Sequence, residues 1–445
     1  MSLKNKIIQD VKRRKLSRAL SDDSSQIKND DADAVVDSLL TSGSITSFEA
    51  FSEYKDIQLH RFAAEKMRIE SPFFKVHEGL SQDTSMIAGR EMLNFSSYDY
   101  LGINGDSRQT SAVKAALDIY GVSSSASRLV SGERPIQGQL ESKLAELHGV
   151  DDAAIFVSGH ATNVSTIGCL FNSADLIVHD ALVHNSVLEG VQLSGARRAT
   201  FPHNDIQALE KILVDSRHKY RRTLVVVEGL YSMDGDYPDL PRLIALKDRH
   251  DALLMVDEAH SVGVMGELGR GIAEHFNIDA HDVDIWMGTL SKSFASTGGY
   301  IAGSSALVDM VKNLVPGFVY SVGVAPVMAA AALTAIDILH QEPERVAKLK
   351  ANARLFDSLA KKQGIDTGLN RQLAVIPGMM GDSINAVKAA HLLSEAGVNV
   401  QPIIHPAVEE RLARLRFFIC SSHNATQIEQ AVEALAKVMR ELDLI

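Results

Sequence analysis

A lysine and an aspartate, thirty-five positions apart, are the residues of this chain best placed to do chemistry. Lys292 lies among small and hydroxylated residues in the segment 288–294. Asp257 ends the apolar run 253–256, where a carboxylate must emerge into a polar site or meet a positive partner. A pyridoxal 5'-phosphate (PLP) enzyme needs such a pair, because the lysine amine holds the cofactor as a Schiff base and the aspartate keeps its pyridine nitrogen protonated.

Each of these two residues also has other interpretations. Asp257 could cap the N-terminus of a helix, and Lys292 taken alone could be an ordinary surface lysine. The segment Asp257-Glu258-Ala259-His260 also spells the DEAH box of nucleic-acid helicases. That interpretation requires an upstream phosphate-binding loop of the form Gly-x-x-x-x-Gly-Lys-Ser/Thr, and the sequence contains none. The helicase interpretation is therefore excluded.

Two segments could bind the phosphate of such a cofactor. Residues 288–293 are small or hydroxylated apart from Leu290 and Lys292, so backbone and hydroxyl groups can approach an anion. The segment 157–163 predicts a strand end, a turn at Gly159 and a helix start, and free N–H groups at a helix N-terminus bind phosphate. His184, taken alone, is equally well interpreted as a residue on a helix surface or as one that stacks on a ring.

Alternating short apolar runs and helical stretches predict the scaffold that holds these residues. The runs expected to form strands are 153–157, 176–178, 224–227, 253–256 and 284–287. Their content of Val, Leu and Ile indicates burial on both faces, which favours a largely parallel sheet. Helices are expected between them, for example at 206–219 and at 241–249, the second with proline in its first turn. This α/β pattern is doubly wound, and such sheets bind ligands at the carboxyl ends of their strands.

The chain divides into three predicted parts. Residues 1–70 form an N-terminal extension, partly helical or mobile, with an amphipathic helix around 34–40 and a solvated stretch at 21–25. Residues 71–332 form a large PLP-binding domain. Residues 333–445 form a smaller C-terminal α+β domain with a long helix from about 333, strands near 373–376 and 398–403, and a last helix from 427. The apolar run 324–339 is too short to cross a bilayer and predicts a core helix.

Composition argues against several classes of protein. A formal net charge of −11 at pH 7 argues against nonspecific nucleic-acid binding, which depends on basic patches. The two cysteines, Cys169 and Cys420, have no metal-site spacing and are expected to be buried free thiols in a reducing compartment, and no metal is expected. The first residues lead into charged sequence rather than an apolar signal segment, which predicts a cytoplasmic location.

Five motifs, in the order of a known family, make the chain resemble the α-oxoamine synthases, which are fold-type I PLP-dependent transferases. The motifs are Asn94–Gly102, Ser127–Gly132, Glu228–Asp236, Asp257–Gly263 and Gly288–Lys292. The similarity covers about residues 70–440. It implies a large α/β domain with a mostly parallel, doubly wound sheet and a smaller C-terminal α+β domain. The triplet 291–293 and Tyr98 resemble serine palmitoyltransferase and polyketide-associated members more than 8-amino-7-oxononanoate synthase.

The resemblance implies a role for each matched position. Lys292 corresponds to the Schiff-base lysine, Asp257 to the partner of the pyridine nitrogen, and His184 to a catalytic histidine that stacks on the ring. The remaining cofactor contacts that it implies are Gly159 and His160 at the phosphate, His260 at the phenolic oxygen, and the hydroxyls of Ser232 and Thr289. Arg416 best matches the arginine that binds the amino-acid carboxylate, and Arg414, on the same face of its strand, stays open for that role.

Two positions depart from the family pattern. Tyr98 stands where asparagine is usual, in the loop near the amino-acid site. The segment 320–323 replaces the Tyr-Ser-Thr-Ser sequence that reaches the phosphate of the neighbouring subunit in relatives. A homodimer is implied nonetheless, because fold-type I sites are assembled at dimer interfaces.

The implied reaction is a PLP-dependent decarboxylative condensation of a small α-amino acid with an acyl thioester, which gives an α-amino ketone. The thioester is expected on an acyl-carrier protein or on coenzyme A. The N-terminal extension is either a docking or dimer-covering element or a tail without a role. Glycine, alanine and serine all stay open as the amino acid. The alternative function is another PLP reaction of the same fold, such as transamination.

Overall fold

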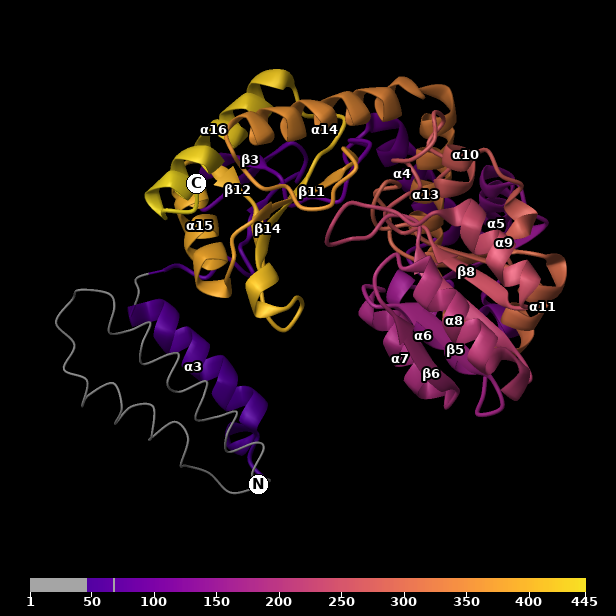
Figure 1. The fold of residues 1–445 in the computed structure, drawn as a ribbon. Helices are drawn as coiled ribbons and strands as arrows, with labels where there is room; N and C mark the ends of the chain where they lie inside the picture. The colour runs from indigo at the N-terminus through magenta and orange to yellow at the C-terminus, as the bar shows by residue number, and fades with distance from the viewer. Residues whose placement is uncertain (1–45, 67–68) are drawn as a thin grey trace.

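The computed structural model describes residues 46–66 and 69–445, which form two lobes and one helix set apart from them (Figure 1). That helix, α3 (Ser52–Lys66), follows the short turn η1 (Phe48–Ala50). It lies within the predicted extension 1–70. The helix expected around 34–40 and the solvated stretch expected at 21–25 fall outside the described residues.

One lobe is built on a seven-stranded sheet. Along the sheet the strands are β4 (Asp152–Phe156), β10 (Gly299–Gly303), β9 (Ile285–Thr289), β8 (Leu253–Asp257), β7 (Thr223–Glu228), β5 (Leu176–Asp180) and β6 (Arg197–Phe201). Neighbours from β9 to β6 pair in parallel, while β10 is antiparallel to both β4 and β9. The predicted mostly parallel, doubly wound sheet is confirmed. All five expected strands are present, within two residues of their predicted bounds.

Burial explains why these runs form central strands. The glycines of β10 explain why that strand was not predicted. Every residue of β5 and β7 is buried, and each strand has a run of at least three apolar residues, as expected for a strand covered on both faces. The sequence of β10 has a glycine at each end, which weakens a strand pattern. Gly299 is required here, because a Cβ at this position would lie 2.6 Å from the Cα of Gly159. The glycine therefore lets β10 pack against the turn that follows β4.

Helices cover this sheet and connect its strands. They are α4 (Ser107–Tyr120), α5 (Pro135–His148), α6 (Gly159–Leu170), α7 (Asn185–Ser194), α8 (Ile206–Ser216), α9 (Leu240–Arg249), α10 (Ile272–Phe276), α11 (Ser305–Leu314), α12 (Pro316–Val319) and α13 (Pro326–Gln341). Shorter helical turns are η2 (Arg128–Gly132), η3 (Arg217–Lys219) and η4 (Ala280–Asp282). The helix expected at 206–219 is α8 continued by η3, and α9 has Pro241 in its first turn as predicted.

The apolar run 324–339 forms α13 in the interior, as predicted. Its alanines at 329–332 and at 335 are buried, and the helix packs against α4 and α5. The long helix expected from about 333 is interrupted, because the chain breaks after α13 and restarts as α14 (Glu344–Lys362). Pro343 explains the break, since proline cannot continue a helix. Among the described helices, none has the length and apolar content needed to cross a membrane.

The other lobe contains two small sheets. One has the order β11 (Val375–Met379), β14 (Arg414–Phe418), β13 (Gln401–Ile403), and the other has β1 (His77–Glu78), β2 (Thr84–Ile87), β3 (Arg90–Asn94), β12 (Val398–Asn399). The last helices are α15 (Ser383–Glu395) and α16 (Ala425–Glu441), with the short turn η5 (Glu410–Leu412) before β14. The last helix was expected from 427 and begins two residues earlier. The boundaries at 70 and 332 stay a prediction.

The single strand expected at 398–403 is two strands in two sheets, so that prediction was wrong. β12 pairs in parallel with β3, whereas β13 pairs antiparallel with β14. Val400, between them, is buried where the chain passes from one sheet to the other. Pro402 has no N–H to donate, which suits β13 because it is an edge strand. Local sequence showed one apolar run and could not show its two partners.

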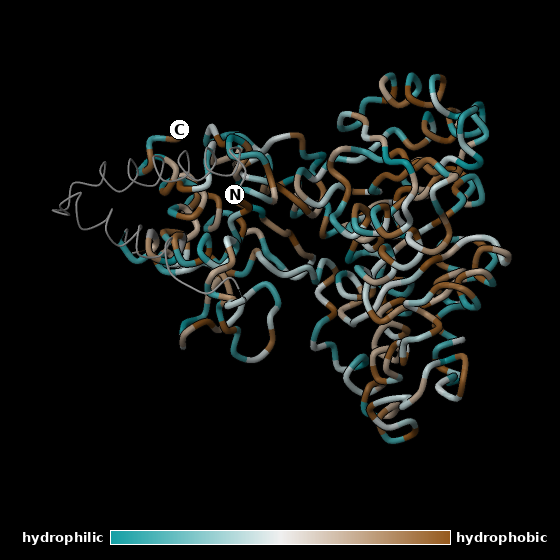
Figure 2. Tube along the Cα trace, turned by 90° about the horizontal axis from the view of Figure 1, so that it is seen from below, coloured by the Kyte–Doolittle hydropathy of each residue, from teal (hydrophilic) through white to brown (hydrophobic). Residues whose placement is uncertain are grey.

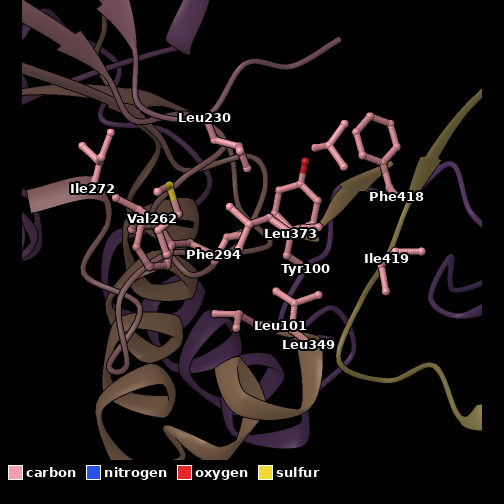
Figure 3. Close-up of a cluster of buried hydrophobic side chains, with 14 of the residues drawn as sticks. Tyr100, Leu101, Leu230, Val262, Ile272, Phe294, Leu349, Leu373, Phe418 and Ile419 are labelled. Atoms are coloured by element: carbon pink, nitrogen blue, oxygen red, sulfur yellow. The ribbon is translucent and has the colours of Figure 1, made fainter. Parts of the chain in front are cut away.

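Apolar side chains pack where the two lobes meet. Figure 2 shows hydrophobic segments running through both lobes. Figure 3 shows part of this core, in which the ring of Tyr100 faces Phe418 on β14. The centroids of these two rings are 6.1 Å apart, and both side chains are buried. This packing connects the loop after β3 to the strand that carries Arg414 and Arg416.

Both cysteines have free thiols, but only one is buried. Cys420 is 2% exposed, as predicted. Cys169 is half-buried, because it lies near the surface end of α6 with its thiol donating to the carbonyl of Leu314 at 3.3 Å. The cytoplasmic location stays a prediction.

Candidate active site

The carboxyl ends of β7 and β8 form the acidic end of the site. Asp257, the last residue of β8, is 4% exposed. One carboxylate oxygen accepts a hydrogen bond from the N–H of Ala259 at 3.0 Å, and the other accepts one from the side-chain amide of Asn163 at 2.8 Å. Glu228 lies beside Asp257 in register at the end of β7. Burial, together with the nearby Asp257 carboxylate, raises the pKa of Glu228, which keeps Glu228 protonated at neutral pH.

Lys292 lies in a loop after β9 that is fixed by its neighbours. The hydroxyl of Ser293 donates to the carbonyl of Val262 at 2.7 Å, and a side chain at Gly263 would collide with Ser293. Within the described residues, the amine of Lys292 makes no hydrogen bond or ion pair, and it lies 5.9 Å from the ring centroid of Tyr98. Burial lowers the pKa of Lys292 to about 8. A fraction of this amine is therefore neutral near pH 7, which is the form that reacts with a carbonyl.

A helix N-terminus lies at the same edge of the sheet. α6 begins at Gly159, directly after β4, and the Ser158 hydroxyl caps it by accepting a hydrogen bond from the N–H of Ala161 at 3.1 Å. A Cβ at Gly159 would lie 3.0 Å from the hydroxyl oxygen of Thr289. The first N–H groups of a helix have no intrahelical acceptor and bind anions. The structure therefore places Thr289 against the N-terminus of α6, whose first two residues, Gly159 and His160, have N–H groups suited to an anion.

Three histidines surround this edge of the sheet. His184 is exposed at the start of α7, and its ring centroid is 6.5 Å from that of His160. The ring of His160 also lies 3.2 Å from a carboxylate oxygen of Glu189. His260 is buried, and its Nδ1 lies 2.7 Å from the hydroxyl of Tyr100. Burial holds the pKa of His260 well below its ordinary value, so this ring is neutral.

The two candidate arginines on β14 have different surroundings. Arg414 is 3% exposed and forms a buried ion pair with Asp234. Arg416 is only partly buried, and one guanidinium nitrogen donates to the backbone carbonyl of Ser232 at 3.0 Å. The guanidinium carbon lies 4.6 Å from the ring centroid of Phe418. The other terminal nitrogen, Nη2, makes only a long contact of 3.5 Å, to the hydroxyl of Tyr98 on the exposed side of the residue. Arg416 therefore has donors left for a ligand, whereas Arg414 is occupied by a carboxylate.

Several residues at the site were not singled out from the sequence as site residues. Asn163 and Ser186 contact Asp257 and His184, and Glu228 and Tyr100 contact the neighbouring segments. Asn163 belongs to the segment 157–163 that was expected to bind phosphate, and the structure places its side chain beside Asp257. The contact of Tyr100 with His260 joins residues 160 positions apart, which the sequence does not display, whereas Ser186 and Glu228 contact residues only two and four positions away.

These residues fit PLP on the chemistry of their donors and acceptors. An amine without a partner suits an aldehyde, and the helix N-terminus at Gly159 suits a phosphate. The carboxylate of Asp257 suits a protonated pyridine nitrogen. All three lie at the carboxyl edge of one sheet, as predicted for a doubly wound fold.

Comparison with known proteins gives the family. Residues 90–435 match the model of the aminotransferase class I and II family. The chain is 39% identical to 8-amino-7-oxononanoate synthase of Symbiobacterium thermophilum over 361 residues, which cover 81% of this chain and 92% of that enzyme. The enzyme of the same name from Geobacter sulfurreducens is 38% identical, over 82% of this chain and 93% of that enzyme. The chain belongs to the α-oxoamine synthase family.

Solved structures agree with this family. Sphingomonas wittichii serine palmitoyltransferase superposes with a TM-score of 0.85 at 30% identity, covering 88% of this chain and 99% of that one. A structure of SPT with PLP superposes with a TM-score of 0.85 at 28% identity and the same coverages. The predicted fold-type I PLP-dependent transferase and its cofactor are therefore confirmed.

This α-oxoamine synthase is a PLP-dependent C-acyltransferase that condenses an amino acid with an acyl thioester, with loss of carbon dioxide. The predicted function is confirmed at this level, and transamination is not favoured. The sequence relatives and the structural relatives carry different names, so the comparisons leave the particular amino acid and acyl group open.

Proposed function

We propose that Lys292 and Asp257 form the chemical centre of this enzyme. PLP, when bound, supplies an electron-accepting ring that stabilises negative charge on the amino-acid Cα. Lys292 holds the cofactor and, once displaced by the substrate amine, removes the Cα proton at Nζ. Its lowered pKa, about 8, supports this role because a neutral amine is required. Asp257 keeps the pyridine nitrogen protonated through a carboxylate that is buried and held by two hydrogen bonds.

The observation that carries this proposal is the unpartnered amine of Lys292 at the edge of the sheet where Asp257 emerges. The same geometry supports the other proposed contacts. We assign the phosphate to the N–H groups of Gly159 and His160 and to the hydroxyl of Thr289. His260 and Ser232 are assigned to other polar groups of the cofactor. The decisive experiment is the replacement of Lys292, argued in the Discussion.

Arg416 is the proposed anchor of the amino-acid carboxylate. Its partly free guanidinium supports this choice over Arg414, which is paired with Asp234. Anchoring the carboxylate orients the bonds around Cα, which decides which bond is broken first. His184 is the proposed donor to the oxygen of the acyl group, where negative charge develops as the new carbon–carbon bond forms.

We propose that the acyl group arrives on an acyl-carrier protein rather than on coenzyme A. Residues 1–20 contain seven lysines and arginines and one acidic residue, Asp10, in a chain whose net charge is −11. A basic segment attracts an acidic partner and raises the rate of encounter. This supports the extension as a docking element for a carrier domain with an acidic surface.

Neutralising this basic segment should slow the reaction with a carrier-bound thioester only. We expect K12A/R13A to lower kcat/KM for an acyl-carrier thioester about fivefold at low salt, and to leave kcat/KM for the same acyl group on coenzyme A unchanged. K211A/K219A removes the same charge from exposed positions outside the extension and serves as control. Equal efficiency with both donors in the unaltered enzyme would contradict the proposed docking.

A homodimer is the proposed assembly, supported by exposed apolar residues on adjoining segments. Leu129 and Val130 in η2 are 59% and 79% exposed, and Tyr320 and Val322 after α12 are 84% and 46% exposed. η2 and α12 pack together, so these side chains form one patch of the kind that proteins cover in an interface. V130D should shift sedimentation toward the single 48.3 kDa chain, while V214D on α8 should not. A single-chain mass for the unaltered protein would contradict the dimer.

A further inference from the structure

Four residues from three elements form one chain of hydrogen bonds between two proposed site residues. The Nδ1 of His184 lies 2.7 Å from the hydroxyl oxygen of Ser186. This hydroxyl lies 3.0 Å from the amide nitrogen of Asn163, which in turn lies 2.8 Å from a carboxylate oxygen of Asp257. His184 and Ser186 belong to the start of α7, Asn163 to α6, and Asp257 to the end of β8. The chain therefore connects an exposed ring to a buried carboxylate.

The chemistry of these groups fixes the direction of each hydrogen bond. A carboxylate only accepts, so Asn163 donates from its amide nitrogen to Asp257. The same nitrogen donates to the oxygen of Ser186, whose one hydrogen is then available to Nδ1 of His184. The backbone N–H of Ser186 also donates to this Nδ1, at 3.2 Å. Nδ1 thus accepts twice and carries no proton.

The proton of the neutral ring must then be on Nε2 of His184. The middle of the chain is shielded from water, because Asn163 and Ser186 are each 1% exposed. The surroundings also lower the pKa of His184, chiefly by desolvation, which favours the neutral ring. Hydrogen bonds within the protein therefore fix the tautomer of His184.

We propose that Asn163 and Ser186 are positioning residues that hold the proton of His184 on Nε2 and fix the carboxylate of Asp257. Through this chain, one amide orients both the ring that donates toward the substrate and the carboxylate that faces the pyridine nitrogen. The inference rests on the roles proposed above for His184 and Asp257. It adds two residues that touch neither substrate nor cofactor.

The tautomer of His184 can be read directly by ¹⁵N NMR of the holoenzyme labelled in histidine, with the His184 signals assigned by their loss in H184Q. In the unaltered enzyme we expect the Nε2–H form. S186A removes the hydroxyl donor and leaves only the longer backbone N–H contact at Nδ1, so it should populate the Nδ1–H form in part, with a fall in kcat of about tenfold. S186T keeps a hydroxyl and should restore both the Nε2–H form and kcat. T166V is the matched control, since it removes a buried hydroxyl of α6 that has no partner among the described residues.

N163A tests the other end of the chain and keeps the proposal falsifiable if S186A folds poorly. It should mix the two tautomers of His184 and lower kcat about tenfold, with a smaller change in the KM of the amino acid. An unchanged Nε2–H signal in both S186A and N163A would overturn the proposal. Failure of the proposed function would look different, because H184Q would then keep full activity even though S186A and N163A still change the tautomer of His184.

Discussion

Replacement of Lys292 by alanine is expected to abolish turnover and to remove the visible absorbance of the bound cofactor. This amine has no hydrogen-bond or ion-pair partner in the described part of the chain. Without it, the enzyme loses both the covalent hold on PLP and the base that removes the Cα proton. We expect kcat to fall by about a thousandfold or more, measured with an amino acid and an acyl thioester, while the absorbance spectrum reports the cofactor.

K75A is the matched control for this experiment. Lys75 is also a partly buried lysine whose pKa is lowered by burial, but its amine donates to the hydroxyl of Ser394 at 2.7 Å. Its removal should leave turnover and absorbance unchanged. A fully active K292A enzyme would contradict the assignment of Lys292 and, with it, the proposed mechanism.

The positions of Lys292 and Asp257 could be predicted because both follow strands that are covered on two faces. The buried middle of such a strand is apolar, so a charged residue at its end stands out in the sequence. The apolar runs that form β8 and β9 therefore mark this edge of the sheet in the sequence itself. The turn at Gly159 was predictable for a related reason, since a strand followed by glycine and a helix leaves a distinct local pattern.

The rest of the site depends on contacts between distant segments and could not be predicted from local sequence. The choice between Arg414 and Arg416 is set by Asp234, about 180 positions earlier in the chain. The link from Asn163 to Asp257 likewise joins residues 94 positions apart. Neither pairing alters hydrophobic periodicity, which is what predicts elements from sequence. The same limit explains why residues 398–403 were expected in one strand when they belong to two sheets.

Loss of the guanidinium of Arg416 is expected to have the second largest effect. R416L should lower kcat/KM for the amino acid by about a hundredfold, mostly through KM, because the substrate carboxylate loses a charge-assisted pair of hydrogen bonds. R416K should recover part of this loss, since a lysine restores the charge but not the planar pair of donors. Binding of PLP should persist in both variants, because Arg416 is assigned to the substrate and not to the cofactor.

Replacing the neighbouring arginine, Arg414, distinguishes a role in binding the substrate carboxylate from a role in stabilising the fold. Arg414 is buried against Asp234, so R414L leaves an uncompensated buried carboxylate and should lower the free energy of unfolding by about 3 kcal/mol. Denaturant titration should therefore show a large loss of stability for R414L and a small one for R416L. Steady-state kinetics should show the reverse order for the KM of the amino acid. If R414L instead raised this KM a hundredfold in a stably folded enzyme while R416L did not, the carboxylate anchor would be Arg414.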